Sequence, residues 1–158
     1  MAEAISDEIQ MNPVRKVQKI VADIIRGAKW FSIHNVEIIE QDSQALRFLL
    51  MKTVNQLKGV SVVVGVDGLR NNYPAIEVDL TITAAESVLV NRAKPNSVTA
   101  IDAIQAAIAV VDGEWWQFQS MEHNSSGSGI LVATANFKGL VEREFFFDGS
   151  GNNEKKEG

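Results

Sequence analysis

The sequence contains no cysteine, and histidine occurs only twice, as His34 and His123. Without cysteine the chain can form no disulfide, thiolate nucleophile, iron–sulfur cluster or cysteine-based zinc site. Two histidines without an H-E-x-x-H pattern do not supply the ligands of a zinc site, so we expect no metal. The sequence also lacks a glycine-rich motif for binding the phosphates of a cofactor, because the run Gly65-Val66-Asp67-Gly68 has no third glycine. We therefore expect no cofactor.

Basic residues are fewer than acidic ones, 15 against 20, which gives a net charge of -5. A protein that binds nucleic acid needs a concentrated basic face, so we expect no sequence-specific nucleic-acid binding. No stretch approaches the roughly 18 apolar residues of a membrane helix, so we expect no membrane partner. The segment Met1 to Gln10 is acidic and lacks the features of a signal peptide, and we expect synthesis in the cytoplasm.

The composition is that of a folded globular domain. The chain has 158 residues, of which 46% are hydrophobic and 22% are charged. This length suits one core better than two. No apolar residue follows Phe147, so the sequence predicts a single α+β domain over residues 1–147 and a flexible C-terminal tail over 148–158.

Apolar residues that recur every three or four positions predict three helices. Each lies between a capping residue and a glycine that ends it. The segments are Asn12 to Gly27, with Pro13 in the first turn, then Asp42 or Ser43 to Leu57, with Gly59 behind it, and Ser97 to Asp112-Gly113.

β-branched runs and strict alternation predict four strands. They are Val60 to Val66, Ala75 to Thr83, Trp115 to His123 and Ile130 to Glu142. Phe31 to Ile39 is a further short strand or an irregular lead, and Ser87 to Val90 extends the second strand past an irregularity at Ala84-Ala85. The residues Asp67 to Pro74 are typical of a turn throughout.

The predicted order is helix, helix, strand, strand, helix, strand, strand. It indicates an α+β fold in which a mainly antiparallel sheet of about four strands carries helices on one face. The loop from Asn124 to Gly129 joins the last two strands as a hairpin. Its Ser126-Gly127-Ser128-Gly129 run is not a nucleophile elbow, because no helix follows it.

The aromatic residues near the C-terminus indicate an interface. Consecutive side chains of a strand point to opposite faces, so Trp115 and Trp116 cannot both enter one core, and Phe145, Phe146 and Phe147 divide in the same way. Exposed aromatic surface is typical of protein–protein contacts. These five rings are therefore candidate interface residues; alternatively, a helix over the second sheet face buries both tryptophans within one subunit.

Paired carboxylates are the remaining enzymatic candidate. Glu77 and Asp79 lie two apart on one strand face and alternate with threonines. Acid–base catalysis also needs a cleft and perturbed pKa values, which the sequence does not indicate, so a solvated face is the simpler interpretation and we do not expect an enzyme.

Several of these features together resemble the tail-terminator proteins of long-tailed bacteriophages and related tail-like particles. They are the capped first helix, the second helix ending in glycine, the buried strand, the strand start Pro74-x-Ile76-x-Val78, the stretch from Glu86 to Asn91-Arg92, the helix beginning near Thr99 and the closing hairpin. The resemblance spans about Asn12 to Arg143 and is one of element order, without a diagnostic motif. Neck, tube and completion proteins are near alternatives.

The resemblance implies a viral structural protein located in the virion tail. The subunit would form a homo-oligomer, a hexameric ring that terminates the tail tube and contacts tail-tube and neck or head-completion proteins. The acidic face of Glu77 and Asp79 would line the lumen, where negative charge repels passing DNA. Two further hypotheses are a cytoplasmic adaptor that docks a partner protein through its aromatic strands, and an enzyme with a carboxylate site.

Overall fold

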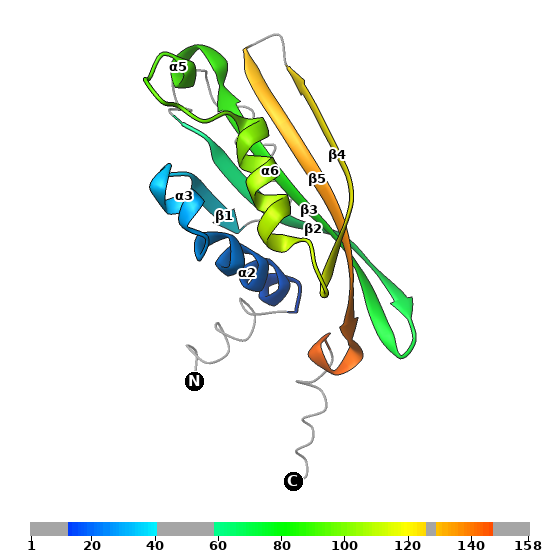
Figure 1. Cartoon of the computed structure of the whole chain (residues 1–158). Coiled ribbons are helices and arrows are strands. Elements are labelled where there is room, and N and C mark those ends of the chain that lie inside the picture. The colour runs from blue at the N-terminus through cyan, green and yellow to red at the C-terminus, as the bar shows by residue number, and fades with distance from the viewer. Residues whose placement is uncertain (1–12, 41–58, 126–128, 147–158) are drawn as a thin grey trace, which may run out of the picture.

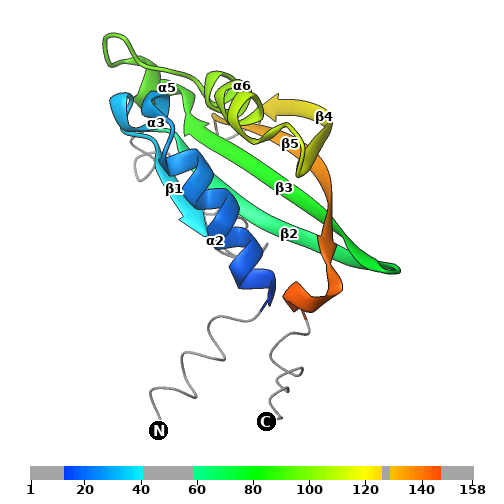
Figure 2. The ribbon, with the colours of Figure 1, turned by 60° about the horizontal axis from the view of Figure 1, so that its bottom comes forward.

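Helices cover one face of a β-sheet in the computed structural model of this protein, which describes residues 13–40, 59–125 and 129–146 (Figure 1). Within these ranges the helices are α2 (Pro13–Arg26), α3 (Lys29–Ile33), α5 (Val88–Arg92) and α6 (Ala100–Val111), and residues 143–146 form a helical turn. The strands are β1 (Glu37–Glu40), β2 (Ser61–Asn72), β3 (Ala75–Ser87), β4 (Trp116–Ser125) and β5 (Ile130–Glu142). Figures 1 and 2 show α2 and α6 on the same face of the sheet, and the two helices contact each other.

The sheet confirms the α+β class and corrects the strand count and pairing. Its order over the described residues is β1-β2-β3-β5-β4, so it has five strands rather than about four. β1 pairs with β2 in parallel, and the other neighbours pair antiparallel, which makes the sheet mixed. The short helices α3 and α5 were not expected either. The predicted helix from Asp42 or Ser43 to Leu57, the cap Asn12, the loop residues 126–128 and the tail 148–158 lie outside the described residues.

The β2–β3 hairpin is longer than the sequence predicts. Asp67 to Pro74 was expected to be a turn, but β2 continues to Asn72, and the turn consists of Tyr73 and Pro74, joined by a cis peptide bond. The register shifts once, between Val66 and Gly68, which marks a β-bulge. The hairpin therefore projects beyond the helices (Figure 2).

β3 runs without interruption to Ser87. The irregularity expected at Ala84-Ala85 is not there, because both residues keep their pairing with β5. The strand also does not extend to Val90. Instead the Ser87 hydroxyl accepts a hydrogen bond from the Val90 N–H at 3.4 Å and caps the short helix α5.

The cap of α6 lies two residues later than predicted. Thr99, rather than Ser97, caps the helix: its hydroxyl accepts the Asp102 N–H, and the Asp102 carboxylate accepts the Thr99 N–H, each at 3.0 Å. The Ala100 N–H donates to the fully buried Glu86 at 2.8 Å. Glu86 also accepts hydrogen bonds from Asn91 at 2.7 Å and Arg92 at 3.2 Å, so its charge is paired and the end of β3 is tied to the start of α6.

The main core lies between the two helices and the sheet. α2 contributes Val17, Val21 and Ile25, and α6 contributes small residues with Ile104, all of them buried. The sheet contributes every second residue of its central strands, as the alternation predicted; these are Val62, Val64, Val78, Leu80, Ile82, Ala133, Ala135 and Phe137. Each large apolar side chain buried here stabilises the fold by about 1.5–3 kcal/mol.

Candidate functional site

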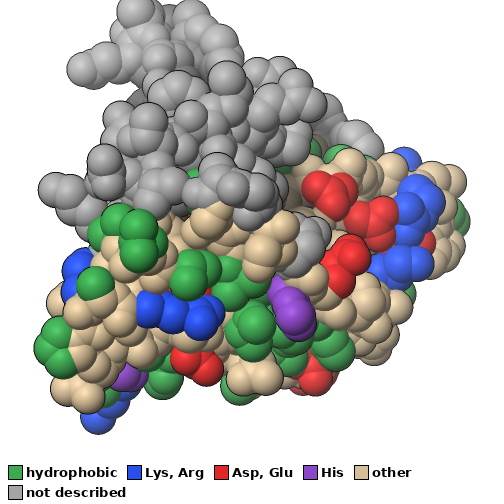
Figure 3. Space-filling model, turned by 90° about the horizontal axis from the view of Figure 1, so that it is seen from above, with side chains coloured by type: hydrophobic (Ala, Val, Ile, Leu, Met, Phe, Trp, Pro, Cys, Tyr) green, Lys and Arg blue, Asp and Glu red, His purple; other side chains and the backbone are tan. Residues whose placement is uncertain are grey.

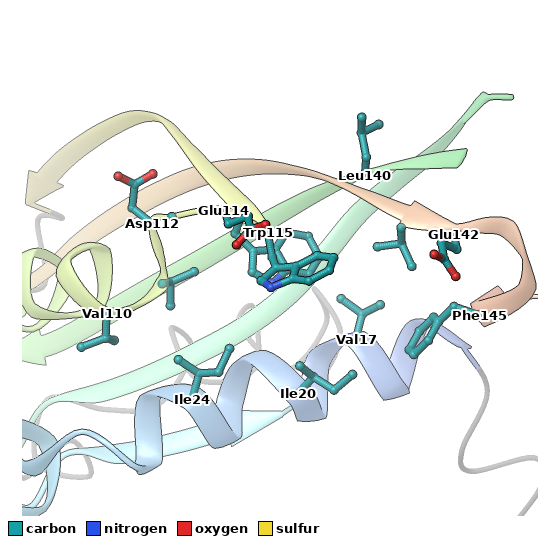
Figure 4. A pocket seen from close by; sticks show the side chains of 14 residues that line it. Val17, Ile20, Ile24, Val110, Asp112, Glu114, Trp115, Leu140, Glu142 and Phe145 are labelled. Carbon is teal, nitrogen blue, oxygen red and sulfur yellow. The ribbon is translucent and has the colours of Figure 1, made fainter. Parts of the chain in front are cut away.

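An apolar groove opens between α2, the end of β5 and the connection from α6 to β4 (Figure 4). Its volume is about 690 Å³. We call it the Trp115 groove, after the indole that lies between α2 and β5. It is lined by Val17, Ile20 and Ile24 of α2, by Val110 to Trp116, and by Leu140 to Glu142 with Phe145.

Trp115 is the exposed member of the tryptophan pair. It is 72% exposed, whereas its neighbour Trp116 is 6% exposed and belongs to the core. The Gly113 N–H donates to the Trp116 carbonyl at 2.8 Å, which makes a tight turn between α6 and β4. Trp116 then pairs with Gly139 of β5, whose missing side chain leaves room for the indole. As predicted, one tryptophan of the pair is buried and the other is exposed. Trp115, however, lies in the turn before β4 rather than in the strand, and the pairing of Trp116 with Gly139 decides which ring faces outward.

The phenylalanine run divides in a similar way. Phe145 is half-buried and lines the groove, with the Lys16 ammonium 5.9 Å from its ring centre. Phe146 is 8% exposed and packs edge-on against Phe145, with ring centres 5.5 Å apart. Phe147 lies outside the described residues. Of the five proposed interface rings, Trp116 and Phe146 are thus core residues of the subunit, and Trp115 and Phe145 remain candidates.

Four aliphatic side chains add to the exposed surface of the groove, and the sequence reasoning missed them. Ile20 and Ile24 follow the apolar periodicity that predicts α2, yet both are exposed, as are Val110 and Leu140. Leu140 pairs with Glu77 on the sheet face opposite the helices, so it lies at the rim. One feature of the sequence does indicate their exposure. The apolar stripe of α2 is wider than the surface that packing against the sheet alone can bury.

The charged residues of the groove share one sign. Among the described residues that line it, the charged ones are Asp112, Glu114 and Glu142, all of them exposed. Asp112 accepts a hydrogen bond from the Phe118 N–H at 2.8 Å, which holds its carboxylate beside the start of β4. The groove therefore has an apolar floor and a mainly acidic rim, with Lys16 beside Phe145 as a basic neighbour, the arrangement of a protein-binding surface.

Glu77 and Asp79 lie on the sheet face opposite the helices and away from the groove floor. Arg70 of β2 donates to Glu77 at 3.2 Å and to both oxygens of Asp79, one of them at 2.9 Å. Lys138 lies 3.6 Å from Glu77. These hydrogen bonds lower the pKa of Asp79 and raise that of Arg70. β3 contributes the two acidic side chains of this face, and the neighbouring strands contribute Arg70 and Lys138, which balance their charge locally.

The two histidines lie in separate elements. His34 follows α3, where its ring lies 4.6 Å from that of Trp30, and His123 is in β4. Within the part of the chain that the structure describes, no three side chains of His, Cys, Asp or Glu come together as metal ligands. None of the described helices is both long and apolar enough to cross a bilayer.

Comparison with known proteins identifies no relative: no protein-family model matches the chain, and neither does any curated protein.

Proposed function

We propose that this protein is a structural subunit that assembles with copies of itself through the Trp115 groove. The observation that supports the proposal is the exposed apolar surface formed by Trp115, Ile20, Ile24, Val110 and Leu140 around one concave site. Soluble monomers rarely expose a contiguous apolar patch of this kind without using it. A tryptophan that becomes buried at the centre of an interface is typically among the residues that contribute most to the binding energy.

The assembly that we propose is the ring of a bacteriophage tail or tail-like particle. In this proposal the subunits close into a hexamer at the end of the tail tube, stop its growth and contact the neck or head-completion proteins. The α+β architecture, with helices on one face of a sheet, and the projecting β2–β3 hairpin support it, since a ring subunit needs extended elements that reach its neighbours. In an infected bacterium the protein would be made in the cytoplasm and end in the virion tail.

Native mass spectrometry of the wild-type protein and of Trp115→Ala tests the first part. We expect the wild type to form a closed oligomer, and the variant to dissociate at concentrations at least tenfold higher, because loss of an interface tryptophan costs about 2 kcal/mol or more. Gln105→Ala is the control, since Gln105 is exposed in α6 and lies outside both the groove and the hairpin. Equal association of Trp115→Ala and wild type would refute the role of the groove.

Electron microscopy of purified tail tubes tests the second part. We expect the added protein to appear as a ring at one end of the tube and to prevent its further growth. Some ring subunits assemble only on their tube, so a protein that is monomeric in solution is also incubated with tubes. A protein that is monomeric in solution and leaves the tube ends bare is not a tail terminator.

An adaptor that binds a different protein is the second candidate, and the concave shape of the groove favours it. A cavity of about 690 Å³ with apolar walls can accept an amphipathic helix as well as a second subunit. In that case the purified protein stays monomeric and binds one partner at equal stoichiometry, and Trp115→Ala abolishes this complex. The same variant thus tests both candidates, and the oligomeric state separates them.

A further inference from the structure

A second exposed apolar surface lies at the other end of the molecule. Ile33, the last residue of α3, is 68% exposed, and Leu89 of α5 is 77% exposed. Figures 1 and 2 both show α3 and α5 at the same end of the sheet. We call this surface the Leu89 end.

The sheet register places α5 far from Trp115. α3 lies closer to the groove, because Lys29 follows the groove residue Ile24 by only five positions. β2 begins at Ser61, opposite Ala85 of β3, and α5 follows β3 directly, whereas β1 begins opposite Ser61 and follows α3. The groove lies toward the start of β3, because Gly139 beneath Trp116 pairs with Val78. From Val78 to the end of β3 at Ser87 the chain takes nine steps, which is roughly 30 Å in an extended strand.

The charges of the Leu89 end are opposite to those of the groove. Lys29 of α3, Arg92 of α5 and Lys94 behind α5 are exposed, and residues 29–34 and 88–95 contain no Asp or Glu. Figure 3 looks onto this end and shows lysine and arginine side chains among hydrophobic ones. Exposed apolar side chains with basic neighbours therefore lie at the α5 end of the sheet, and an apolar groove with acidic residues at its rim lies toward the other end.

We propose that Leu89 of one copy enters the Trp115 groove of the next copy, with Lys29 and Lys94 facing Asp112, Glu114 and Glu142. This inference rests on the proposed function, and it names the two surfaces that the subunits use. Two unlike patches on one subunit make a heterologous, head-to-tail contact, which generates a closed ring when its rotation closes. Opposite charges around an apolar centre also fix the direction of assembly.

A symmetrical contact between two grooves is the main competitor, and its electrostatics are unfavourable. It would place the carboxylates of Asp112, Glu114 and Glu142 against the same carboxylates of the partner. Like charges brought together at an interface cost several kcal/mol. A second copy offering its Leu89 end supplies both the missing apolar cover and the missing positive charge.

Because the chain has no cysteine, introduced cysteines report the contact directly. We mix Leu89→Cys with Trp115→Cys in equal amounts, at a protein concentration well above that at which Trp115→Ala dissociates, so that the weakened contact still forms. The mixture is oxidised with copper phenanthroline, alone and in the presence of tail tubes. Head-to-tail contact predicts a covalent dimer from the mixture and none from either variant alone. The double variant Leu89→Cys/Trp115→Cys should give a ladder of cross-linked species that ends at the ring size.

Gln105→Cys mixed with Trp115→Cys is the control, because Gln105 is exposed in α6 and belongs to neither surface. Self-cross-linking of Trp115→Cys would overturn the inference in favour of a groove-to-groove dimer. Association of the wild type without cross-linking between the two cysteines would overturn the inference and leave the proposed function standing. A wild type that neither self-associates nor binds tubes would overturn both.

Discussion

At the scale of single residues, the contact between Trp116 and Gly139 determines the groove. Trp116 lies over Gly139 on the core face of the sheet, and this register turns Trp115 outward. A Cβ at position 139 would lie 2.8 Å from the Trp115 carbonyl oxygen and still closer to the Trp116 indole. The glycine is therefore required for close approach of an aromatic ring and a backbone, not for its conformational freedom.

Gly139→Ala should lower the free energy of unfolding by about 1–3 kcal/mol, because the added methyl group overpacks the core against a ring and a carbonyl. Gly113→Ala is the control: no atom lies within 4 Å of an added Cβ there, so we expect a neutral or slightly stabilising change. Urea unfolding monitored by circular dichroism measures both. Equal stability of Gly139→Ala and wild type would mean that the indole does not lie on position 139.

The two adjacent tryptophans should differ sharply in their effect on stability. Trp116→Ala removes a buried ring and should cost about 3–5 kcal/mol, whereas Trp115→Ala removes an exposed ring. For the latter we expect a change within about 0.5 kcal/mol in dilute, monomeric protein. The same unfolding experiment compares them, and a reversed order would show that Trp115 is the core residue. Only Trp115→Ala should weaken assembly without weakening the fold.

At the scale of elements, the sequence predicted those segments whose local pattern and tertiary environment agree. α2 ends at Arg26, next to the predicted end at Gly27, and β5 has the predicted bounds, Ile130–Glu142. β2 did not, because Asp67 to Asn72 consists of turn-forming residues that are held in a strand by pairing with β3 and by the ion pairs of Arg70. β1 has four residues and pairs in parallel with β2, which no local pattern specifies.

The groove was predictable only in part, because its exposed residues also depend on contacts between distant segments. Alternation required that one tryptophan leave the core, but the choice of Trp115 depends on cross-strand register. Ile20 and Ile24 belong to the apolar stripe of α2, and periodicity cannot tell which side of a stripe lacks a neighbour. The burial of Glu86 depends on partners from α5 and α6, which sequence spacing alone does not bring together.

The ion pairs of the β2–β3 hairpin should make stability pH-dependent in acid. Arg70 lowers the pKa of Asp79 below its ordinary value of 3.8, so the pair stabilises the folded state above that pH. The contribution is lost as the pH falls through the lower, folded-state pKa. Asp79→Asn should therefore be less stable than wild type at pH 7, and the difference should shrink as the pH falls through the lowered, folded-state pKa.

Urea unfolding of wild type and Asp79→Asn at a series of pH values measures this effect. Arg70→Met should lose at least as much stability at neutral pH, because it also loses the hydrogen bond to Glu77. The double variant should be no less stable than Arg70→Met, since the pair with Asp79 is already absent there. A difference between wild type and Asp79→Asn that does not change with pH would exclude the pair with Arg70 as its source.

At the scale of the whole molecule, the two ends of the subunit differ from each other. The acidic Trp115 groove and the basic residues around Leu89 lie toward opposite ends of β3. A net charge of -5 keeps free subunits apart through their overall repulsion, while the local charges attract at the two ends. Association should accordingly weaken when salt screens these charges, over a Debye length of about 8 Å at physiological ionic strength.

Charge reversal at the two ends provides the decisive test of this polarity. Lys29→Glu alone places a glutamate against Glu114 at every contact, and Glu114→Lys alone places two lysines together, so each variant should associate at least tenfold more weakly than wild type at low salt. A mixture of the two restores an opposite-charge pair at both kinds of contact, because the introduced glutamate faces the introduced lysine at one contact and the native Lys29 faces the native Glu114 at the next. The mixed ring should therefore form again, with the variants alternating and an even number of subunits. Native mass spectrometry distinguishes the variants by mass, and failure of the mixture to assemble, when wild type does, would contradict head-to-tail contact between these ends.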